Sequence, residues 1–140
     1  MRGRTVSKKA AARHNRVRKQ HSDELAEDYV EAIGALLGER GQARVTDLQG
    51  VFGVSHVSVI RALKRIEERG LVERTEAGGY ELTRTGKAIA EASAERHDLV
   101  VRFLLALGVS SGQAEADAEG MEHHLSEESL RAMKAFLESQ

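Results

Sequence analysis

Apolar residues recur at intervals of three and four along most of the chain, which is the period of an amphipathic helix. The first such run spans about residues 23–40, with apolar positions at Leu25, Tyr29, Ile33, Leu36 and Leu37. Ser22 or Asp23 can cap this helix, and Gly41 follows it. The chain contains no proline, so nothing of that kind interrupts the helical pattern. The pattern predicts a mainly α-helical protein.

Residues 44–70 predict two helices joined by a tight turn. Thr46 is expected to cap the first, whose apolar face holds Leu48, Val51 and Phe52. Gly53 permits the turn, and Ser55 is expected to cap the second helix. The inward face of that helix is formed by Val59, Leu63 and Ile66. This arrangement is typical of a helix-turn-helix motif.

Residues 71–83 predict a β-hairpin, with the turn at Gly78-Gly79 and with Tyr80 and Leu82 directed inward. A hairpin directly after a helix-turn-helix is a wing. A long helix is expected from about Thr85 to Gly108, with Val100, Phe103, Leu104 and Leu107 on one face. Two shorter helices follow, over residues 111–123 and after a cap at Ser126, the latter with Leu130, Met133 and Leu137. We therefore predict a winged helix-turn-helix domain over residues 23–84, followed by a helical domain over residues 85–140.

The amino-acid composition excludes several kinds of functional site. The 140 residues include no cysteine, which excludes disulfides, thiolate zinc sites, iron–sulfur clusters and cysteine nucleophiles. The longest apolar stretch, residues 99–109, is too short to span a bilayer and contains Arg102. The N-terminus lacks the apolar core of a signal peptide. We expect a cytoplasmic protein without a membrane partner, in which any metal is bound by oxygen and nitrogen.

Charge is distributed unevenly along the chain. Residues 1–21 hold eight of the 21 basic residues and no acidic residue, although the net charge of the whole chain is −1. The remainder carries 13 basic and 22 acidic residues, a net charge of −9. We expect residues 1–22 to form a flexible basic arm. Such an arm is typical of nucleic-acid binders, but a solubilising tail has the same composition.

The outward surface of the second helix of the motif carries groups that can read DNA. Hydroxyl, imidazole and small apolar groups at its start can contact base edges or thymine methyls, and cations further along can reach guanine or phosphate. The candidate DNA-binding residues are Ser55, His56, Val57, Ser58, Arg61, Lys64 and Arg65, with Arg74 and Arg84 of the wing region expected at the backbone. The alternative is a solvated helix in a packing module. Aromatic residues make up only 4%, which argues against single-stranded RNA.

Ligand atoms are concentrated in EGMEHH (119–124). On a helix, Glu119, Glu122 and His123 stand at i, i+3 and i+4 and share one face. In isolation, this pattern is more often a solvated surface. Asp28 and Glu31 share a face in the same way on the first helix, whereas a lone histidine such as His97 is more often structural.

Gathered into one site, four carboxylates and two imidazoles favour manganese or ferrous iron over copper. The four carboxylates carry a charge of −4, which two divalent cations would cancel. Without metal these charges repel, so the elements that carry them should hold together poorly.

The chain resembles the manganese-responsive repressors of the diphtheria toxin repressor family over about residues 23–138. The stretches that carry the resemblance are EDYVEAI (27–33), the helix-turn-helix GVS…RALKRIEERGLVE, ELTRTGKAIA (81–90), ERHDLVVRFLLALGV (95–109) and DAEGMEHHLSEESL (117–130). The resemblance implies a winged-helix domain joined to a helical dimerisation domain, with metal between them. The implied ligands are Asp28, Glu31, His97, Glu119, Glu122 and His123, whereas the position of His124 is not usually a ligand.

The resemblance also implies the metal. Iron-sensing relatives have methionine where Asp28 stands and cysteine where Glu119 stands, so the two carboxylates here imply manganese. We expect no additional SH3-like domain after the dimerisation helices. The expected function is manganese(II)-dependent repression of manganese-uptake genes by a homodimer on a palindromic DNA operator, with about two Mn²⁺ per subunit and no small organic substrate. The alternatives are a metal-independent winged-helix regulator, an iron(II)-responsive repressor, and a carboxylate-bridged two-metal enzyme, for which no substrate-orienting motif is present.

Overall fold

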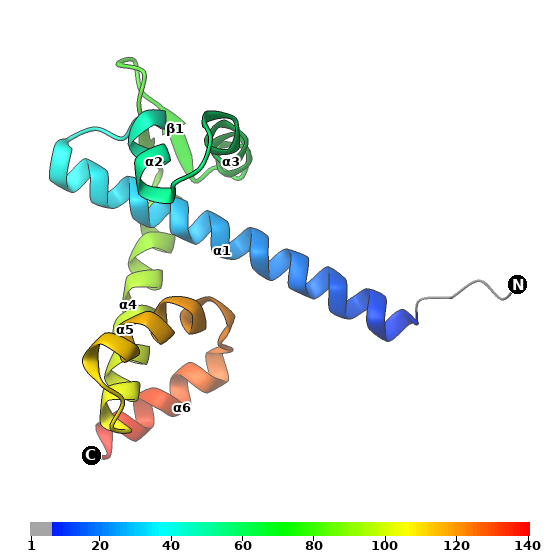
Figure 1. Ribbon diagram of the computed structural model, residues 1–140, viewed down its shortest axis with the longest axis vertical. Coiled ribbons are helices and arrows are strands. Elements are labelled where there is room, and N and C mark those ends of the chain that lie inside the picture. Colours follow the sequence, from blue (N-terminus) through cyan, green and yellow to red (C-terminus); the bar gives the residue numbers. More distant parts are fainter. Residues whose placement is uncertain (1–6) are drawn as a thin grey trace, which may run out of the picture.

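A computed structural model describes residues 7–140 and shows two lobes joined by one long helix (Figure 1). The upper lobe contains three helices and a two-stranded hairpin: α1 (Lys8–Arg40), α2 (Val45–Phe52), α3 (His56–Glu68), β1 (Val72–Arg74) and β2 (Tyr80–Leu82). The connecting helix is α4 (Arg84–Ala106). The lower lobe contains α5 (Ser111–Met121), a 3₁₀ turn η1 (Glu122–His124) and α6 (Glu127–Glu138). The predicted mainly helical fold with a winged helix-turn-helix is confirmed.

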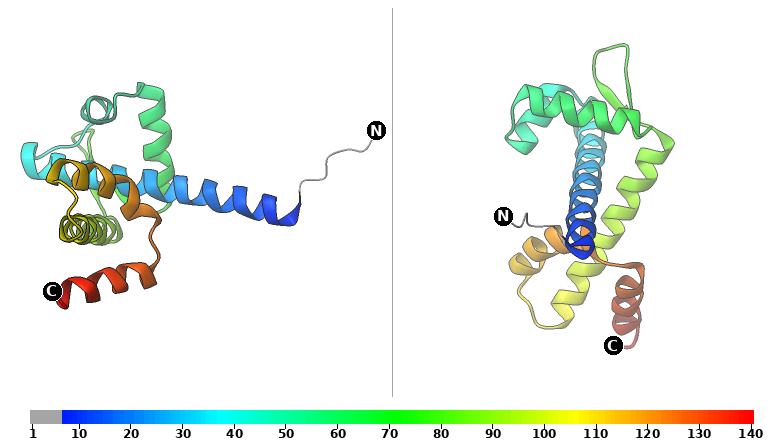
Figure 2. Two further views of the ribbon diagram at one scale, coloured as in Figure 1. Left: turned by 60° about the horizontal axis from the view of Figure 1, so that its bottom comes forward. Right: turned by 90° about the vertical axis from the view of Figure 1, so that its right-hand side faces the viewer.

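Helix α1 is longer than the apolar pattern predicts. It begins at Lys8, where the Ser7 side chain accepts a hydrogen bond from the backbone N–H of Ala10, so the predicted cap at Ser22 or Asp23 is wrong. Residues 8–22 include no glycine or proline and are rich in alanine, lysine and arginine, all strong helix formers. This part of the expected flexible arm therefore continues α1 and projects away from both lobes (Figures 1 and 2). Arg2 and Arg4 lie outside the described residues.

The helix-turn-helix forms as predicted, with one change of cap. Ser55 caps α3 by accepting from the backbone N–H of Ser58, and Gly53 adopts the left-handed φ of 63° that the turn requires. Helix α2 begins one residue before Thr46, with Arg44 at the cap position. The Asp47 carboxylate accepts from the Arg44 backbone N–H at 2.9 Å, and this interaction replaces a hydroxyl cap.

The upper core is built on α1. Tyr29, Val30 and Ile33 are almost fully buried, and the Tyr29 ring stacks on Phe52 of α2 with the ring centroids 4.4 Å apart. From α2 and α3 the core receives Leu48, Val59, Leu63 and Ile66. Leu25, predicted to face this core, is 36% exposed. It lies on α1 where that helix leaves the lobe.

The wing is pinned to the same core. Strands β1 and β2 pair antiparallel with Glu73 opposite Glu81, and the backbone N–H of Tyr80 donates to the Ala43 carbonyl at 2.8 Å. Tyr80 is buried and Leu82 is half-buried, as the alternation predicts. Thr83 then caps α4, so the wing leads directly into the connecting helix.

A second core lies at the far end of α4. Val100, Val101 and Leu104 pack against small residues of α5 and against Leu130 of α6. Leu107, predicted on the same face, is 57% exposed because it follows the last turn of α4. No helix within residues 7–140 is both long enough and apolar enough to cross a membrane.

The junction of the wing with α4 depends on Gly86. A Cβ at this position would lie 2.1 Å from the backbone carbonyl oxygen of Leu71, and neither backbone can move without disturbing the hairpin. We expect Gly86→Ala to lower the free energy of unfolding by about 2–3 kcal/mol in urea titrations, as overpacking does. Gly38→Ala, where nothing lies within 4 Å, should instead leave stability unchanged or raise it by up to ~1 kcal/mol. Equal stability of both variants would contradict the prediction.

Candidate metal centre

The six predicted ligand residues converge where α1 passes between the two lobes. Helix α1 packs against α4 and η1 at this point. The two helical pairs that the sequence indicated face each other, with the α4 histidine between them. The contributors are Asp28 and Glu31 of α1, His97 of α4, Glu119 of α5, and Glu122 and His123 of η1.

Glu122 lies at the centre of this cluster. Its side chain is 1% exposed, and neither carboxylate oxygen has a hydrogen-bond partner among the described residues. Its Oε1 lies 3.2 Å from His123 Nε2 and its Oε2 lies 3.2 Å from His97 Nδ1. Burial raises the pKa of Glu122 to about 7. Buried carboxylates of this kind are normally compensated by a cation or by several donors.

His123 lies between the carboxylates of α1 and Glu122. Its Nδ1 lies 2.5 Å from Glu27 Oε2, and its Nε2 lies 3.3 Å from Asp28 Oδ1. Contacts with Asp28 and Glu27 raise the pKa of His123 to about 10. In the metal-free protein the protonated ring therefore supplies positive charge where carboxylates converge.

Glu27 was not predicted, although its role follows from the structure. Burial would raise its pKa, but the hydrogen bond with His123 and the charge of Arg96, 2.9 Å away, lower it overall. A carboxylate on one ring nitrogen of a histidine fixes the tautomer and frees the other nitrogen for a metal. Here Glu27 occupies Nδ1 and leaves Nε2 facing the cluster.

In His97 the two ring nitrogens have the opposite roles to those in His123: Nδ1, not Nε2, faces Glu122. Its Nε2 lies 2.8 Å from Glu115 Oε2, and its Nδ1 faces Glu122 and, at 3.5 Å, Glu119. Burial would lower the pKa of His97, but the hydrogen bond with Glu115 and the nearby carboxylates raise it. His97 is therefore not enclosed in the apolar core: its side chain is 27% exposed and both of its ring nitrogens contact carboxylates.

Glu31 completes the α1 face. Burial raises the pKa of Glu31, although the hydroxyl of the buried Ser93 donates a hydrogen bond to it. Glu24, Glu27, Asp28 and Glu31 recur at i, i+3, i+4 and i+7, so helical spacing alone could have found Glu24 and Glu27. Glu115 stands at the same kind of spacing, four residues before Glu119, whereas Ser93 has no such signal in the sequence.

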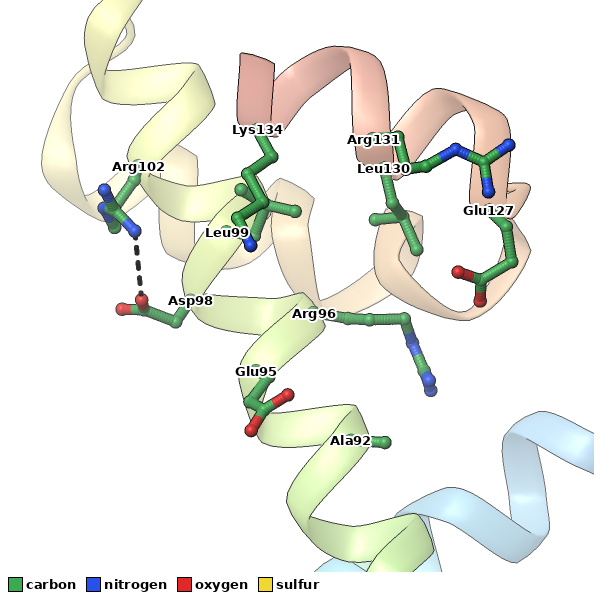
Figure 3. A pocket seen from close by; sticks show the side chains of 10 residues that line it. All are labelled: Ala92, Glu95, Arg96, Asp98, Leu99, Arg102, Glu127, Leu130, Arg131 and Lys134. Carbon is green, nitrogen blue, oxygen red and sulfur yellow. Dashed lines mark ion pairs between the residues drawn. The ribbon is translucent and has the colours of Figure 1, made fainter. Parts of the chain in front are cut away.

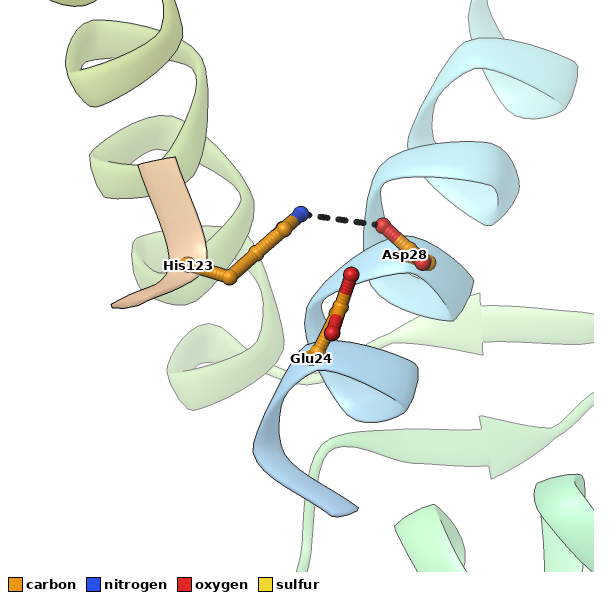
Figure 4. A group of neighbouring side chains, drawn as sticks. All are labelled: Glu24, Asp28 and His123. Atoms are coloured by element: carbon orange, nitrogen blue, oxygen red, sulfur yellow. Dashed lines mark ion pairs between the residues drawn. The ribbon is translucent and has the colours of Figure 1, made fainter. Parts of the chain in front are cut away.

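Two overlapping groups bring ligand atoms within 4.8 Å of one another: Asp28 with Glu31 and Glu119, and Asp28 with Glu24 and His123 (Figure 4). Carboxylate oxygens with one or two imidazole nitrogens suit hard and borderline divalent cations such as Mn²⁺ and Fe²⁺. The donor set and the unsatisfied Glu122 therefore fit a divalent metal.

A shallow groove between α4 and α6 lies beside this cluster (Figure 3). Arg96 lines the groove and at the same time pairs with Glu27. The other charged side chains that line the groove include both basic and acidic residues. Arg102 and Asp98 form an ion pair at 3.8 Å. The groove has no converging donor set comparable with that of the metal cluster.

The predicted DNA-facing residues belong to α3 and its N-cap, to the wing and to the start of α4. Ser55, His56, Val57, Ser58, Arg61, Lys64, Arg65, Arg74 and Arg84 are all exposed. The Ser55 hydroxyl donates to the Ser58 hydroxyl, so both side chains are partly engaged in the cap. Arg74 lies 3.6 Å from Glu67 and over the Tyr80 ring. Val51 was predicted on the apolar face of the first helix of the motif, but it is 53% exposed, and Val54 in the turn is 39% exposed.

Comparisons with known proteins agree with this arrangement. Residues 83–139 match the family model "Iron dependent repressor, metal binding and dimerisation domain", and residues 30–102 match "HVO_A0261 N-terminal domain". The chain is 48% identical over 120 residues to the transcriptional regulator MntR of Escherichia coli O6:H1, covering 86% of this chain and 77% of that protein. The chain belongs to the manganese transport regulators of the diphtheria toxin repressor family. The resemblance drawn from the sequence motifs is confirmed.

Further relatives and solved structures support the same family. MntR of Salmonella typhimurium is 47% identical over 86% of this chain and 76% of its own length. A manganese-dependent transcriptional repressor in complex with manganese superimposes with a TM-score of 0.71 at 28% identity, covering 80% of this chain. The manganese regulator SloR gives a TM-score of 0.71 at 25% identity, covering 82%. This chain spans about half the length of those two structures, 52% and 54%.

Proposed function

We propose that this chain is a manganese(II)-dependent transcriptional repressor, whose homodimer binds a palindromic operator when its metal site is filled and represses manganese-uptake genes. The observation that carries the proposal is Glu122. It is a buried carboxylate that has no hydrogen-bond partner within the described part of the chain, at the point where α1 meets η1. The same helix α1 forms the core of the DNA-binding lobe, so a ligand for Glu122 also acts on that lobe. The named MntR relatives are transcriptional regulators, which supports a non-enzymatic role.

The residues that would hold the metal are the six that converge around Glu122: Asp28, Glu31, His97, Glu119, Glu122 and His123. Bound divalent ions would supply the positive charge that this cluster lacks. Two Mn²⁺ per subunit would cancel the four carboxylates of the set. Carboxylates at positions 28 and 119 favour Mn²⁺ over the iron(II) alternative through coordination number and geometry, because raw affinity alone would favour the later metals.

Coupling between metal and DNA follows from the double role of α1. Asp28 and Glu31 face the metal cluster, while Tyr29, Val30 and Ile33 of the same turns are buried in the helix-turn-helix core. A metal that joins α1 to η1 and α4 would fix the upper lobe relative to the lower lobe. In a homodimer this would hold two α3 helices near the spacing of one DNA turn, about 34 Å, or a multiple of it. The metal thereby reduces the ordering cost of DNA binding.

The DNA-facing surface divides into two kinds of contact. Hydroxyl, imidazole and valine side chains at the start of α3 would contact base edges and thymine methyls, whereas Arg61, Lys64 and Arg65 would contact guanine or phosphate. Arg74 and Arg84 would contact the backbone. The basic extension of α1 would add phosphate contacts, in which case its removal should reduce the salt dependence of DNA binding.

Fluorescence anisotropy on promoter fragments of manganese-uptake genes, at fixed salt, tests the proposal. We expect tight binding with Mn²⁺ and a loss of about 5- to 150-fold with chelator. Arg61→Ala should weaken DNA binding by about 1–3 kcal/mol without changing Mn²⁺ affinity. Arg131→Ala on α6, away from the DNA-facing surface, is the matched control. Equal binding with manganese and with chelator would leave a metal-independent winged-helix regulator.

A further inference from the structure

We propose that Glu24 is a metal ligand, which extends the site by one helical turn beyond the six residues assigned above. The inference rests on the proposed metal-dependent function. Glu24 precedes Asp28 by four residues on α1, so both carboxylates project from the same face of the helix. A ligand atom from each of Glu24, Asp28 and His123 lies within 4.8 Å of the others, and Figure 4 shows the three side chains converging in the space between α1 and η1.

The unsatisfied carboxylate of Glu122 points to the same position. His123 Nε2 lies 3.2 Å from Glu122 Oε1 on one side and 3.3 Å from Asp28 Oδ1 on the other. Since neither oxygen of Glu122 has a hydrogen-bond partner among residues 7–140, a divalent ion in place of the His123 proton would compensate this carboxylate. A divalent ion beside Nε2 would reach this imidazole and the carboxylates of Glu24 and Asp28, next to the buried Glu122. One imidazole and carboxylate oxygens are a suitable donor set for Mn²⁺, with water completing the coordination.

The surroundings of the position support metal binding over a chance cluster. Glu27 lies at His123 Nδ1, which directs Nε2 toward Glu24 and Asp28. Glu24 is held at the edge of the cluster by His124, whose Nε2 lies 3.2 Å from Glu24 Oε2. The side chains of Glu24 and His124 are 26% and 40% exposed, so this edge is open to solvent. Glu24 would therefore close the solvent side of a position whose inner side is formed by Glu122.

Two substitutions at Glu24 separate ligation from a general effect of charge. In Glu24→Gln the carboxylate charge is lost, whereas in Glu24→Asp the charge is kept but the side chain is one methylene shorter. A ligand requires both charge and reach. We therefore expect both variants to lower the Mn²⁺ affinity of one class of binding sites at least about tenfold. The matched control is Glu91→Gln, an exposed carboxylate on α4.

The measurement is a Mn²⁺ titration of the full chain, in which free Mn²⁺ is counted by its six-line EPR spectrum and affinity is determined against a competing chelator. Far-UV circular dichroism verifies that each variant is folded. Weakened binding in both Glu24 variants, with the control unchanged, would support the proposal. Wild-type affinity and stoichiometry in Glu24→Gln, or in Glu24→Asp alone, would overturn ligation by Glu24.

Glu122→Gln, titrated in parallel, distinguishes failure of this inference from failure of the proposed function. If Glu122→Gln loses Mn²⁺ while the Glu24 variants bind normally, only the role of Glu24 is refuted. If neither Glu122→Gln nor the Glu24 variants change Mn²⁺ binding, the whole metal site is refuted, and with it the proposed function.

Discussion

Replacing Glu122 by glutamine is expected to abolish the manganese response of DNA binding and, at the same time, to stabilise the metal-free protein. The two effects have one cause. The Glu122 carboxylate is 1% exposed and its oxygens lack hydrogen-bond partners, so its charge is costly unless a cation is bound. Glutamine has nearly the same shape and carries no charge, so it removes both the cost and the metal ligand.

The expected magnitudes are large enough to measure independently. Operator affinity in Mn²⁺ should fall to the level seen with chelator, a change of about 5- to 150-fold. At pH 8 the free energy of unfolding of the metal-free protein should rise by about 1–3 kcal/mol in urea titrations. This gain should largely vanish at pH 5, because burial raises the pKa of Glu122 to about 7 and the wild-type side chain is then already neutral.

Glu128→Gln, at an exposed position in the first turn of α6, is the control for loss of one carboxylate. It should leave both the manganese response and the stability of the metal-free protein nearly unchanged. A Glu122→Gln protein that still binds DNA only with Mn²⁺ would show that the buried carboxylate is not a ligand.

Stability of the metal-free protein is expected to fall as pH rises from about 5 to about 9. The folded-state pKa of Glu122 is raised from 4.5 to about 7, and that of His123 from 6.5 to about 10. In both pH windows the folded state therefore binds more protons than the unfolded state. The stabilisation from Glu122 is complete below pH 4.5 and is lost as pH passes about 7, whereas that from His123 is complete below pH 6.5 and is lost toward pH 10.

Three other titratable groups of the cluster also contribute to the pH dependence of stability. The pKa values of Glu31 and His97 are also raised, so they add to the loss of stability with rising pH. Glu27 has a lowered pKa, and the stability it contributes is lost only below its ordinary pKa of 4.5, outside this window. Because Glu122 and His123 interact, their contributions do not add. We expect a total loss on the order of 3 kcal/mol between pH 5 and 9.

Thermal unfolding at several pH values, with Mn²⁺ and with chelator, is the measurement. Manganese should reverse the trend, since ligands must be deprotonated to bind metal and stabilisation by Mn²⁺ then grows with pH. His123→Gln should flatten the metal-free profile above pH 6.5, the ordinary pKa of the histidine. His14→Gln, on the exposed α1 extension, should leave the profile unchanged. If the stability of the metal-free wild-type protein did not change with pH, that result would contradict the burial of these charged groups.

The sequence by itself determined the elements and the set of candidate ligands. Helical spacing identified α3 and α6 together with their serine caps, and two glycines identified the turn of the wing. These features depend on residues close together in the chain, so local preferences decide them. The same local logic placed Asp28 with Glu31, and Glu119 with Glu122 and His123, on single helical faces. It was incomplete at the start of α1, where strong helix formers extend the helix beyond its apolar face.

Only the tertiary structure decided which of these faces meet and which side chains lose water. Periodicity shows that Glu122 lies beside His123, but burial of Glu122 arises because α1 crosses α4 and covers η1. The partners of the two histidines, Glu27 and Glu115, likewise depend on contacts between different helices. Glu27 and His123, for example, lie 96 positions apart, and no local pattern encodes such a contact. Desolvation and pairing of charges, which produce the properties of this site, therefore belong to the packed fold.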